Sequence, residues 1–428
     1  MSILKATVWN GAAVGVRLST GLVLNKILAV LVGPPGYAII GQFQNAVMIL
    51  FTVSAGAINN GVVKYTADHE GDPRKQAQLW STAVWIVVVT STVIGLLVAL
   101  FHRSLAVHFL GNAEFSTVFL WLAGSILLFT LNTLFLSILA GKKDLRTYVL
   151  SNIAGSALIL VAMALLTWEF GLYGALVAMA INQASVFFVT VWLCWDKAWF
   201  RRENMLGPFS RPVAINLIMF AVMAAVSAIS NNLGQVAVRY LLVTEFGIRF
   251  AGYWDGMIKI SQVNMLLVAT TMSFYFIPRM AELTYWEDIK QEVWDGCKII
   301  MPIFAVGALA AYVLRDLVIA LLFTRDFLPM QSLFVWQLAG DTVRVASWFL
   351  AYVMIGRAMI LIYALTEILT NLLFLTLGWW FTRLFGFEGV AVAHLVTYSI
   401  AIIGMYVAID RAGRLPRRLD ATRTPAAP

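Results

Sequence analysis

The chain has 428 residues, of which 61% are hydrophobic and 12% are charged, and its mean hydropathy is +0.84. Soluble globular domains carry about 25% charged residues, so this composition excludes an ordinary soluble protein. Apolar runs of roughly 20 residues, enough to cross about 30 Å of hydrocarbon, recur along the chain. They predict an all-α polytopic membrane protein. They exclude a transmembrane β-barrel, whose strands alternate over about ten residues.

The apolar runs predict twelve transmembrane spans, and we expect the first to be retained rather than cleaved as a signal peptide. The predicted spans are residues 8–32, 37–60, 77–101, 117–139, 147–168, 171–194, 212–243, 251–277, 297–314, 331–355, 360–382 and 387–409. The polar connections are too short for a soluble domain. Two cysteines, Cys194 and Cys297, predict neither a disulfide framework nor a metal cluster.

Basic residues are distributed unequally between the two sides of these spans. With the N-terminus inside, twenty lysines and arginines fall in cytoplasmic segments and five in external ones. The positive-inside rule therefore predicts that both termini are cytoplasmic.

The chain also contains an internal repeat. Three pairs of segments match in order at an offset of 212 to 215 residues: 110–115 with 322–327, 139–150 with 354–365, and 170–178 with 385–393. Each half then has six spans and returns the chain to the cytoplasm, so the halves share one orientation. We expect two six-helix lobes, residues 1–205 and 206–410, related by a pseudo-two-fold axis along the membrane normal, and a basic cytoplasmic tail, residues 411–428. Transporters built from such repeats bind their substrates near the middle of the membrane.

Charged residues inside the predicted spans are the candidate functional groups. A charge at the middle of a membrane costs at least about 2.5–3.5 kcal/mol, so it usually faces a cavity or a partner. The first half contains cations and no acid within its spans, whereas the second half contains both. The cations are Arg17, Lys26, Arg239, Lys259 and Arg344, and the acids are Asp255, Asp341 and Glu367.

Helical spacing groups several of these residues into stripes. The clearest stripe is in span ten, where polar and aromatic residues recur every three or four positions. The stripes are Gln337, Asp341, Arg344, Trp348 and Tyr352 in span ten, Asn232, Gln235 and Arg239 in span seven, and Asp255, Lys259 and Gln262 in span eight. Two interpretations stay open for the charged members: they line a wet interior, or they form intrahelical pairs that reduce the cost of burial.

The two cations of span one differ in position. Lys26 follows Arg17 by nine residues, about half a turn away at ~100° per residue. Arg17 has no local acid and is the stronger candidate for binding an anion. Lys26 lies nearer the external end, where it faces the same interior or extends toward the headgroups.

A cationic interior selects an anion, and arginine presents a planar fork that suits phosphate oxygens. Gln42 is a further candidate polar group of the interior, and Trp348 and Tyr352 are candidate sugar contacts. The sequence contains no nucleotide-binding G-x-x-x-x-G-K-[ST] motif. We therefore expect coupling to a proton or cation gradient, with Asp255, Asp341 and Glu367 as candidate carriers. We also expect no cofactor, metal or catalytic residue.

Several segments resemble one transporter family. They are "KATVWNGAAVGVRL", "NKILAVLVGPPGYAIIGQF", "NNGVVKYTA", "YFIPRMAEL", "LRDLVIALLFTRDF" and "FVWQLAGDTVRVASW". These segments resemble the Wzx-type polysaccharide and O-antigen flippases, close to the branch that carries lipid III of enterobacterial common antigen. The resemblance covers nearly all predicted spans. It places basic residues at Arg17, Lys26 and Arg239, and matches a G-D-x-x-[KR]-V segment to Gly340, Asp341, Arg344 and Val345. Arg17 stands where a lysine is expected.

The resemblance implies a transporter rather than an enzyme. It implies translocation of an undecaprenyl-pyrophosphate-linked oligosaccharide across the bacterial inner membrane by alternating access, with a glycan polymerase as a candidate partner and no nucleic acid. One alternative is a multidrug extruder of the same fold, which should carry an acid in its first-half spans. A second is an integral-membrane glycan polymerase or ligase. Such an enzyme needs a larger external loop than this chain has, and the external-side residues His102 and His108 are isolated in the sequence.

Overall fold

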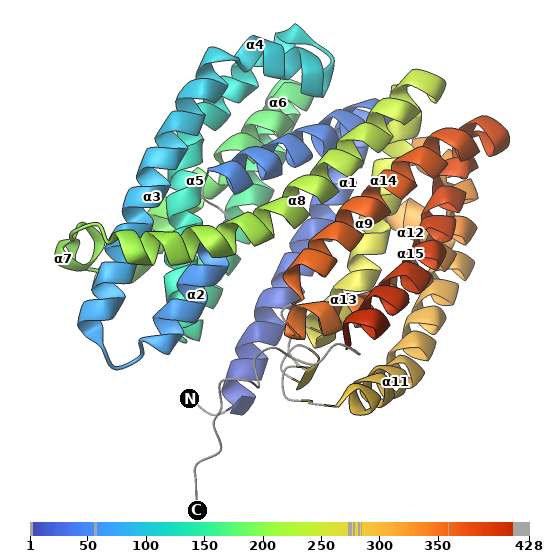
Figure 1. Ribbon diagram of the computed structural model, residues 1–428. Coiled ribbons are helices and arrows are strands. Elements are labelled where there is room, and N and C mark those ends of the chain that lie inside the picture. Colours follow the sequence, from blue (N-terminus) through green and yellow to red (C-terminus); the bar gives the residue numbers. More distant parts are fainter. Residues whose placement is uncertain are drawn as a thin grey trace, which may run out of the picture. The chain divides into compact units, whose positions relative to one another are not determined.

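The structure is a computed structural model that describes residues 3–413, except 55–57, 273–275, 277–278, 281–282, 284 and 358. The regular elements of the described residues are all helices (Figure 1). The chain divides into two compact units. Unit 1 is Met1–Gly256 with Asp316–Gln331, and unit 2 is Met257–Arg315 with Ser332–Pro428. The predicted lobes, 1–205 and 206–410, end at other positions, and that division stays a prediction.

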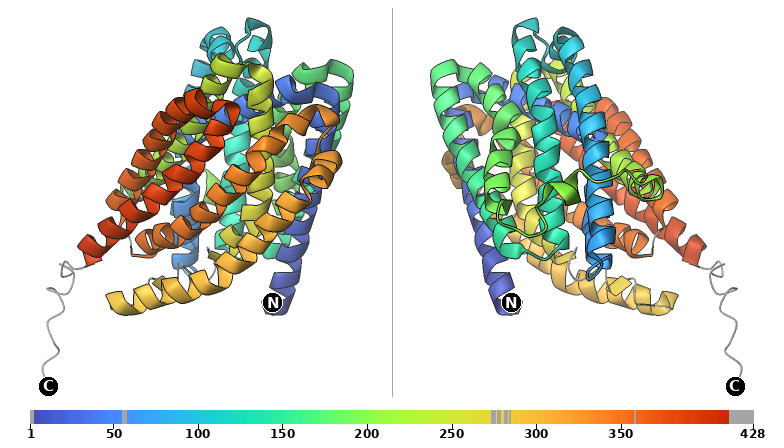
Figure 2. Two further views of the ribbon diagram at one scale, coloured as in Figure 1. Left: turned by 90° about the vertical axis from the view of Figure 1, so that its right-hand side faces the viewer. Right: turned by 90° about the vertical axis from the view of Figure 1, so that its left-hand side faces the viewer.

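Unit 1 is built mainly from long apolar helices. In chain order its elements are α1 (Ile3–Val53), α2 (Asn59–Asp68), α3 (Pro73–Leu100), α4 (His102–Leu105), η2 (Ala106–Leu110), η3 (Ala113–Phe115), α5 (Ser116–Gly141), α6 (Leu145–Cys194), α7 (Arg202–Met205), α8 (Arg211–Phe246) and the start of α9 (Ile248–Thr271). It also contains most of α12 (Arg315–Leu322) and η5 (Arg325–Leu333). Helices α3, α5 and α6 lie alongside one another (Figures 1 and 2).

The two longest helices of unit 1 are each interrupted at a glycine. Helices α1 and α6 contain 51 and 50 residues, which at 1.5 Å per residue is about 75 Å and more than twice the ~30 Å of a hydrocarbon core. Gly33 has φ 61° and ψ −175°, and Gly171 has φ 56° and ψ −137°. Glycine adopts positive φ without the steric cost of a Cβ. Each of these helices is therefore two helical segments joined at a turn.

Unit 2 contains the rest of α9 together with α11 (Trp286–Val313), α13 (Phe334–Gly356), α14 (Ile360–Phe385), η6 (Gly386–Glu388) and α15 (Gly389–Gly413). Helices α13, α14 and α15 pack against one another (Figure 1). A buried cluster that includes Met272, Phe276, Val345 and Phe349 forms its core.

The structure confirms an all-helical membrane protein. Seven described segments are long and apolar enough to span a membrane: Leu18–Val53, Pro73–Leu100, Ala113–Gly141, Leu145–Cys194, Trp286–Val313, Arg325–Gly356 and Leu361–Ala412. Two element boundaries differ from the sequence prediction by more than six residues. The predicted span 37–60 stops earlier, since α1 ends at Val53 and the polar α2 begins at Asn59. Helix α11 begins eleven residues before the predicted span 297–314. Hydropathy did not detect its first turns, because they are polar and charged.

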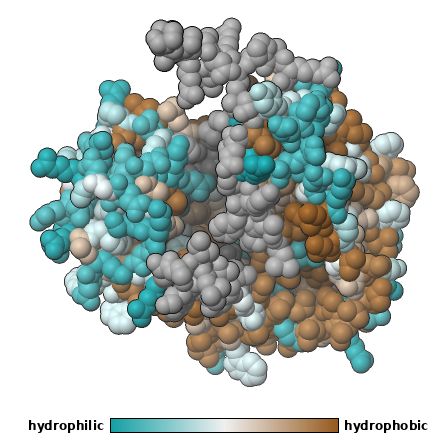
Figure 3. Space-filling view, turned by 90° about the horizontal axis from the view of Figure 1, so that it is seen from below, coloured by the Kyte–Doolittle hydropathy of each residue, from teal (hydrophilic) through white to brown (hydrophobic). Residues whose placement is uncertain are grey.

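Polar turns gather at one end of unit 1. Lys143, between α5 and α6, forms an ion pair with Glu70, between α2 and α3, at 2.8 Å. Asp144 accepts hydrogen bonds from the backbone N–H and the hydroxyl of Thr147, so it caps the first turn of α6. Hydrophilic side chains cover this end of the unit (Figure 3). It is the end that the charge distribution assigns to the cytoplasm.

Candidate functional site

A buried ion pair occupies unit 1. The Arg239 side chain extends from α8 to Asp255 on α9, and its Nε lies 2.6 Å from both carboxylate oxygens. The second guanidinium edge, through Nη2, completes the pair. Arg239 is 6% exposed and Asp255 is 2% exposed. The sequence pattern placed these residues in two separate stripes, and the helix packing brings them together.

Helix α1 closes over this pair. The Arg239 Nη1 donates to Oε1 of Gln42 at 3.3 Å. The preceding residue is Gly41, and a Cβ built there would lie 2.6 Å from the Asp255 Oδ2 and 3.0 Å from the Arg239 Nη2. A side chain at position 41 would therefore displace the pair. The sequence analysis missed Gly41, because a glycine inside an apolar run gives no sign of what approaches it.

Lys26 occupies a defined structural position in unit 1. Its Nζ donates to the backbone carbonyls of Ala320, at 2.7 Å, and Phe323, at 2.5 Å. These carbonyls belong to the C-terminal end of α12, where helical carbonyls lack partners and a positive charge is favoured. In this structure the ammonium group of Lys26 therefore stabilises a helix end.

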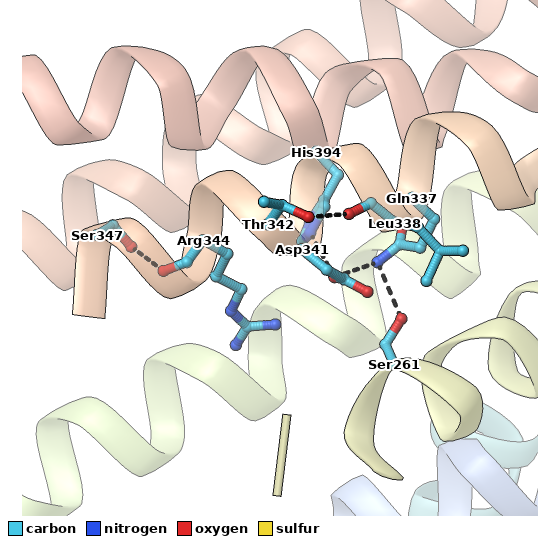
Figure 4. Close-up of polar contacts among 8 residues, drawn as sticks. All are labelled: Ser261, Gln337, Leu338, Asp341, Thr342, Arg344, Ser347 and His394. Carbon is cyan, nitrogen blue, oxygen red and sulfur yellow. Dashed lines mark hydrogen bonds and ion pairs between the residues drawn. The ribbon is translucent and has the colours of Figure 1, made fainter. Parts of the chain in front are cut away.

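A polar network joins three helices of unit 2 (Figure 4). The buried Asp341 on α13 accepts a hydrogen bond on Oδ1 from the Gln337 Nε2 at 3.0 Å, and the His394 Nε2 on α15 lies 3.1 Å from the same oxygen. The Gln337 Nε2 also reaches the Ser261 hydroxyl of α9 at 3.4 Å. Asp341, Gln337 and His394 are all buried. The network connects α9, α13 and α15 by side-chain contacts alone.

Arg344 lies one turn along α13 from Asp341. Among the described residues these two form no ion pair, and Arg344 lies over two aromatic rings (Figure 4 shows it extending away from the carboxylate). Its guanidinium carbon is 5.2 Å from the Tyr398 ring centre and 5.9 Å from the Trp348 ring centre. The carboxylates of Asp341 and Glu367 are within electrostatic range. Of the two interpretations left open for these residues, the intrahelical pair is not formed among the described residues, and Arg344 makes cation–π contacts instead.

The remaining predicted residues occupy various positions. Trp348 and Tyr352 are half-buried and pack against the core cluster of unit 2. Asn232 donates to the Ala228 carbonyl within α8 at 2.7 Å. Lys259 lies half-buried on α9. Gln235 is half-buried, and Arg17 lies in α1 with its side chain outside the described part of the structure. The five predicted cations therefore belong to both units: Arg17, Lys26 and Arg239 to unit 1, and Lys259 and Arg344 to unit 2.

Two residues of unit 2 were missed by the sequence analysis. His394 and Tyr398 lie one turn apart on α15, within the run "GVAVAHLVTYS". A histidine in the middle of an apolar span carries the same cost argument as any other intramembrane polar group. That argument, applied to histidine as well as to Lys, Arg, Asp and Glu, would have found it. Within the part of the chain described here, no group of three or more metal-ligating side chains is brought together.

The helical fold and the buried charges define a polytopic membrane protein with polar clusters inside its membrane-embedded helices. A family model described as polysaccharide biosynthesis protein matches residues 3–284. The chain therefore belongs to this polysaccharide biosynthesis protein family.

Curated relatives and solved structures extend this result. The lipid III flippases of Escherichia coli (strain K12) and Shigella flexneri are each 27% identical over 401 residues, which cover 94% of this chain and 96% of each relative. An inward-facing multidrug resistance transporter of the MATE family has a TM-score of 0.77 at 15% identity, covering 96% of this chain and 100% of that one. The lipid II flippase MurJ in an inward closed conformation has a TM-score of 0.72 at 15% identity, covering 96% and 88%. At this identity, the structures show a shared fold alone.

Proposed function

We propose that this protein is a flippase that moves an undecaprenyl-pyrophosphate-linked oligosaccharide from the cytoplasmic to the periplasmic leaflet of the bacterial inner membrane. The observation that carries the proposal is the match to lipid III flippases along 94% of this chain and 96% of the relatives. A match of that extent leaves little of the chain for a separate domain. The protein is a transporter, and its substrate is of the lipid III or O-antigen type.

Twelve spans in two six-helix lobes fit this function, and the turn glycines support them. Gly33 and Gly247 have φ 61° and 91°, and Gly171 and Gly386 have φ 56° and 65°. The members of each pair are 214 and 215 residues apart, close to the repeat offset in the sequence. Turns at Gly33 and Gly171 would divide α1 and α6 into two spans each, and the long helical segments of the described residues are then compatible with the proposed twelve spans.

The cationic residues supply the proposed attraction for the pyrophosphate. Arg344 lies over two aromatic rings, and its guanidinium forms no ion pair among the described residues. Arg17 lies deep in the first predicted span. Arg239 is engaged with Asp255, so it would act on an anion only through exchange of that partner. We therefore assign the primary contacts to Arg17 and Arg344. An ion gradient would supply the energy for net transport. The protein would move the lipid by alternating access.

A multidrug extruder is the second candidate, because the MATE transporter shares the fold. The first-half spans of this chain contain cations and no acid, a pattern that disfavours organic cations as cargo. A glycan polymerase or ligase is disfavoured by the relatives, which are named as flippases.

Reconstituted vesicles test the proposal directly. The full chain is placed in liposomes with a fluorescent undecaprenyl-pyrophosphate-linked trisaccharide as the probe, and probe that reaches the outer leaflet is measured by a membrane-impermeant quencher. We expect protein-dependent movement of this lipid and no transport of ethidium. Ethidium transport without lipid movement would favour the extruder instead.

The same assay tests the cationic residues. Arg17→Ala and Arg344→Ala should each slow probe movement by about tenfold or more, since a charge-assisted contact to phosphate contributes roughly 1.5–3 kcal/mol. Arg249→Ala is the matched control, because this arginine is exposed outside the predicted spans. Rates equal to the wild-type rate in both interior variants would reject these two contacts.

A further inference from the structure

The Asp341–His394 contact lies where two helices of unit 2 come unusually close. A Cβ built on Gly340 would lie 2.5 Å from the His394 Cδ2 and 3.0 Å from the backbone nitrogen of Leu395. The glycine next to Asp341 therefore allows α13 to approach α15. Backbone packing holds the carboxylate and the imidazole in contact. Gln337 donates to the same carboxylate oxygen, and Ser261 contacts the Gln337 amide.

Charged groups on three helices lie near this contact. The charged groups within electrostatic range of the His394 ring are Asp341 and Arg344, and Arg344 is also within range of Glu367 and the Tyr398 phenol. Helix α9 contributes the Ser261 hydroxyl, and its only charged residue within unit 2 is Lys259. The imidazole therefore contacts a carboxylate, which favours its protonated form, and lies near a guanidinium, which disfavours that form.

Unpartnered acceptors lie on the same side chains. Among the described residues, the Asp341 Oδ2 and the Gln337 Oε1 are buried without a hydrogen-bond partner. Thr397 Oγ1, three residues after His394, is also buried and unpartnered. Buried polar atoms are satisfied in the great majority of cases. Acceptors beside an imidazole and a guanidinium suit a proton better than a metal ion, which needs several oxygen ligands and is repelled by the arginine.

We propose that Asp341 and His394 together bind one proton and form the coupling site of the transporter. This inference rests on the proposed flippase function and names the group that would carry its coupling ion. In the deprotonated state the neutral imidazole donates its Nε2–H to the Asp341 carboxylate. In the protonated state one proton from the external solution is added to the imidazole–carboxylate couple and no other bond changes. Because the two groups interact directly, the proton belongs to the pair.

Gradient-driven transport tests the proposal. Vesicles that hold the full chain and the fluorescent undecaprenyl-pyrophosphate-linked trisaccharide receive a gradient of one pH unit, or a sodium gradient at equal pH, with the membrane potential clamped. One proton per lipid at one pH unit allows about a tenfold shift of the probe between leaflets. We expect this shift in the wild type with the pH gradient and not with sodium. His394→Gln should lose it, because glutamine can donate a hydrogen bond but cannot titrate.

The control variant is His108→Gln, an exposed histidine outside the network, which should keep the wild-type shift. A wild-type shift in His394→Gln overturns the proposal. So does a wild-type protein that moves the lipid but does not respond to the pH gradient, and in that case the flippase function stands. A wild-type protein that does not move the lipid at all rejects the flippase function instead.

A measurement without transport decides the proton site separately. Histidine-labelled protein in detergent is titrated by NMR, with His394→Gln to assign the signal, or with the His394 signal found by elimination through His69, His102 and His108 variants if His394→Gln does not fold. We expect the His394 titration to move when Asp341 is changed to Asn, because the pair shares the proton. A His394 signal that does not titrate between pH 4 and 9, or that is the same in Asp341→Asn, overturns the proposal.

Discussion

Gly41 determines whether the Arg239–Asp255 pair can form. The backbone of α1 passes so close to the carboxylate that a Cβ at this position would lie 2.6 Å from the Asp255 Oδ2. A buried ion pair is strongly coupled to its surroundings, since displacing one partner leaves an uncompensated charge. Glycine at position 41 is therefore required by the neighbouring charges and not by its own backbone, which is helical.

We predict that Gly41→Ala lowers the stability of the protein by about 1–3 kcal/mol, the usual cost of overpacking. The melting midpoint in detergent, followed by size-exclusion chromatography after heating, should fall by several degrees. The matched control is Gly21→Ala in the same helix, where a Cβ would meet nothing within 4 Å. Equal midpoints for the two variants would contradict the close approach of α1 to the pair.

Two half-buried cations inside the predicted spans offset the cost of their charge in different ways. Lys26 binds the carbonyls at the end of α12, and Arg344 lies over the rings of Trp348 and Tyr398. Ala320, Phe323 and Tyr398 belong to elements distant in the sequence, so spacing along one helix could not show these partners. Trp348 lies four residues after Arg344 on α13 and is part of the predicted stripe. The sequence shows that a charge needs a partner, and tertiary packing selects which one.

At the scale of elements, the two halves repeat a turn. Gly171 and Gly386 have φ 56° and 65° with ψ −137° and −147°, a region that is essentially restricted to glycine. Three residues later, a Cβ on Gly174 would lie 1.7 Å from the Leu166 carbonyl oxygen, and one on Gly389 would lie 2.1 Å from that of Phe381. The carbonyl lies eight residues earlier in both cases. The sequence repeat "FGLYG" and "FGFEG" thus encodes the same tight turn twice.

We predict that Gly171→Ala and Gly386→Ala destabilise the protein to a similar extent, by about 1–3 kcal/mol each, because each forces alanine into the same strained conformation. Thermal midpoints in detergent measure the effect. Gly124→Ala and Gly404→Ala are controls in neighbouring helices, where a Cβ would meet nothing within 4 Å. A large loss in one half with none in the other would mean that the two turns do not perform the same structural role.

Elements were easier to predict from the sequence than their contacts were. Hydropathy located the long helices, and the breaks predicted between spans at 33–36 and 169–170 fall at or beside the turns at Gly33 and Gly171. The boundary of α11 was missed, since its polar first turns, with Asp288 and Lys290, are helical without being apolar. The network of Asp341 with His394 was missed because it joins α13 to α15, and periodicity describes one helix at a time.

At the scale of the whole molecule, the repeat and the charge distribution together predict how the two halves are oriented in the membrane. The six spans predicted for each half would place matched positions of the two halves on the same side of the membrane, whereas an inverted repeat would place them on opposite sides. Glu114 and Asp326 are matched by the repeat and are exposed, and both lie on the predicted external side. Glu203 and Gln291 are exposed on the predicted cytoplasmic side.

We predict that single cysteines at these four positions fall into two groups by their labelling in intact cells. The cysteines are introduced into a chain whose Cys194 and Cys297 are changed to serine. Glu114→Cys and Asp326→Cys should react with a membrane-impermeant maleimide, and Glu203→Cys and Gln291→Cys should react only after the cells are opened. Labelling of open membranes controls for the accessibility of each thiol. If Glu114→Cys and Asp326→Cys reacted from opposite sides, the halves would be inverted, and the parallel two-lobe arrangement would be wrong. If all four patterns were reversed, the lobes would still be parallel, but the direction inferred from the basic residues would be wrong.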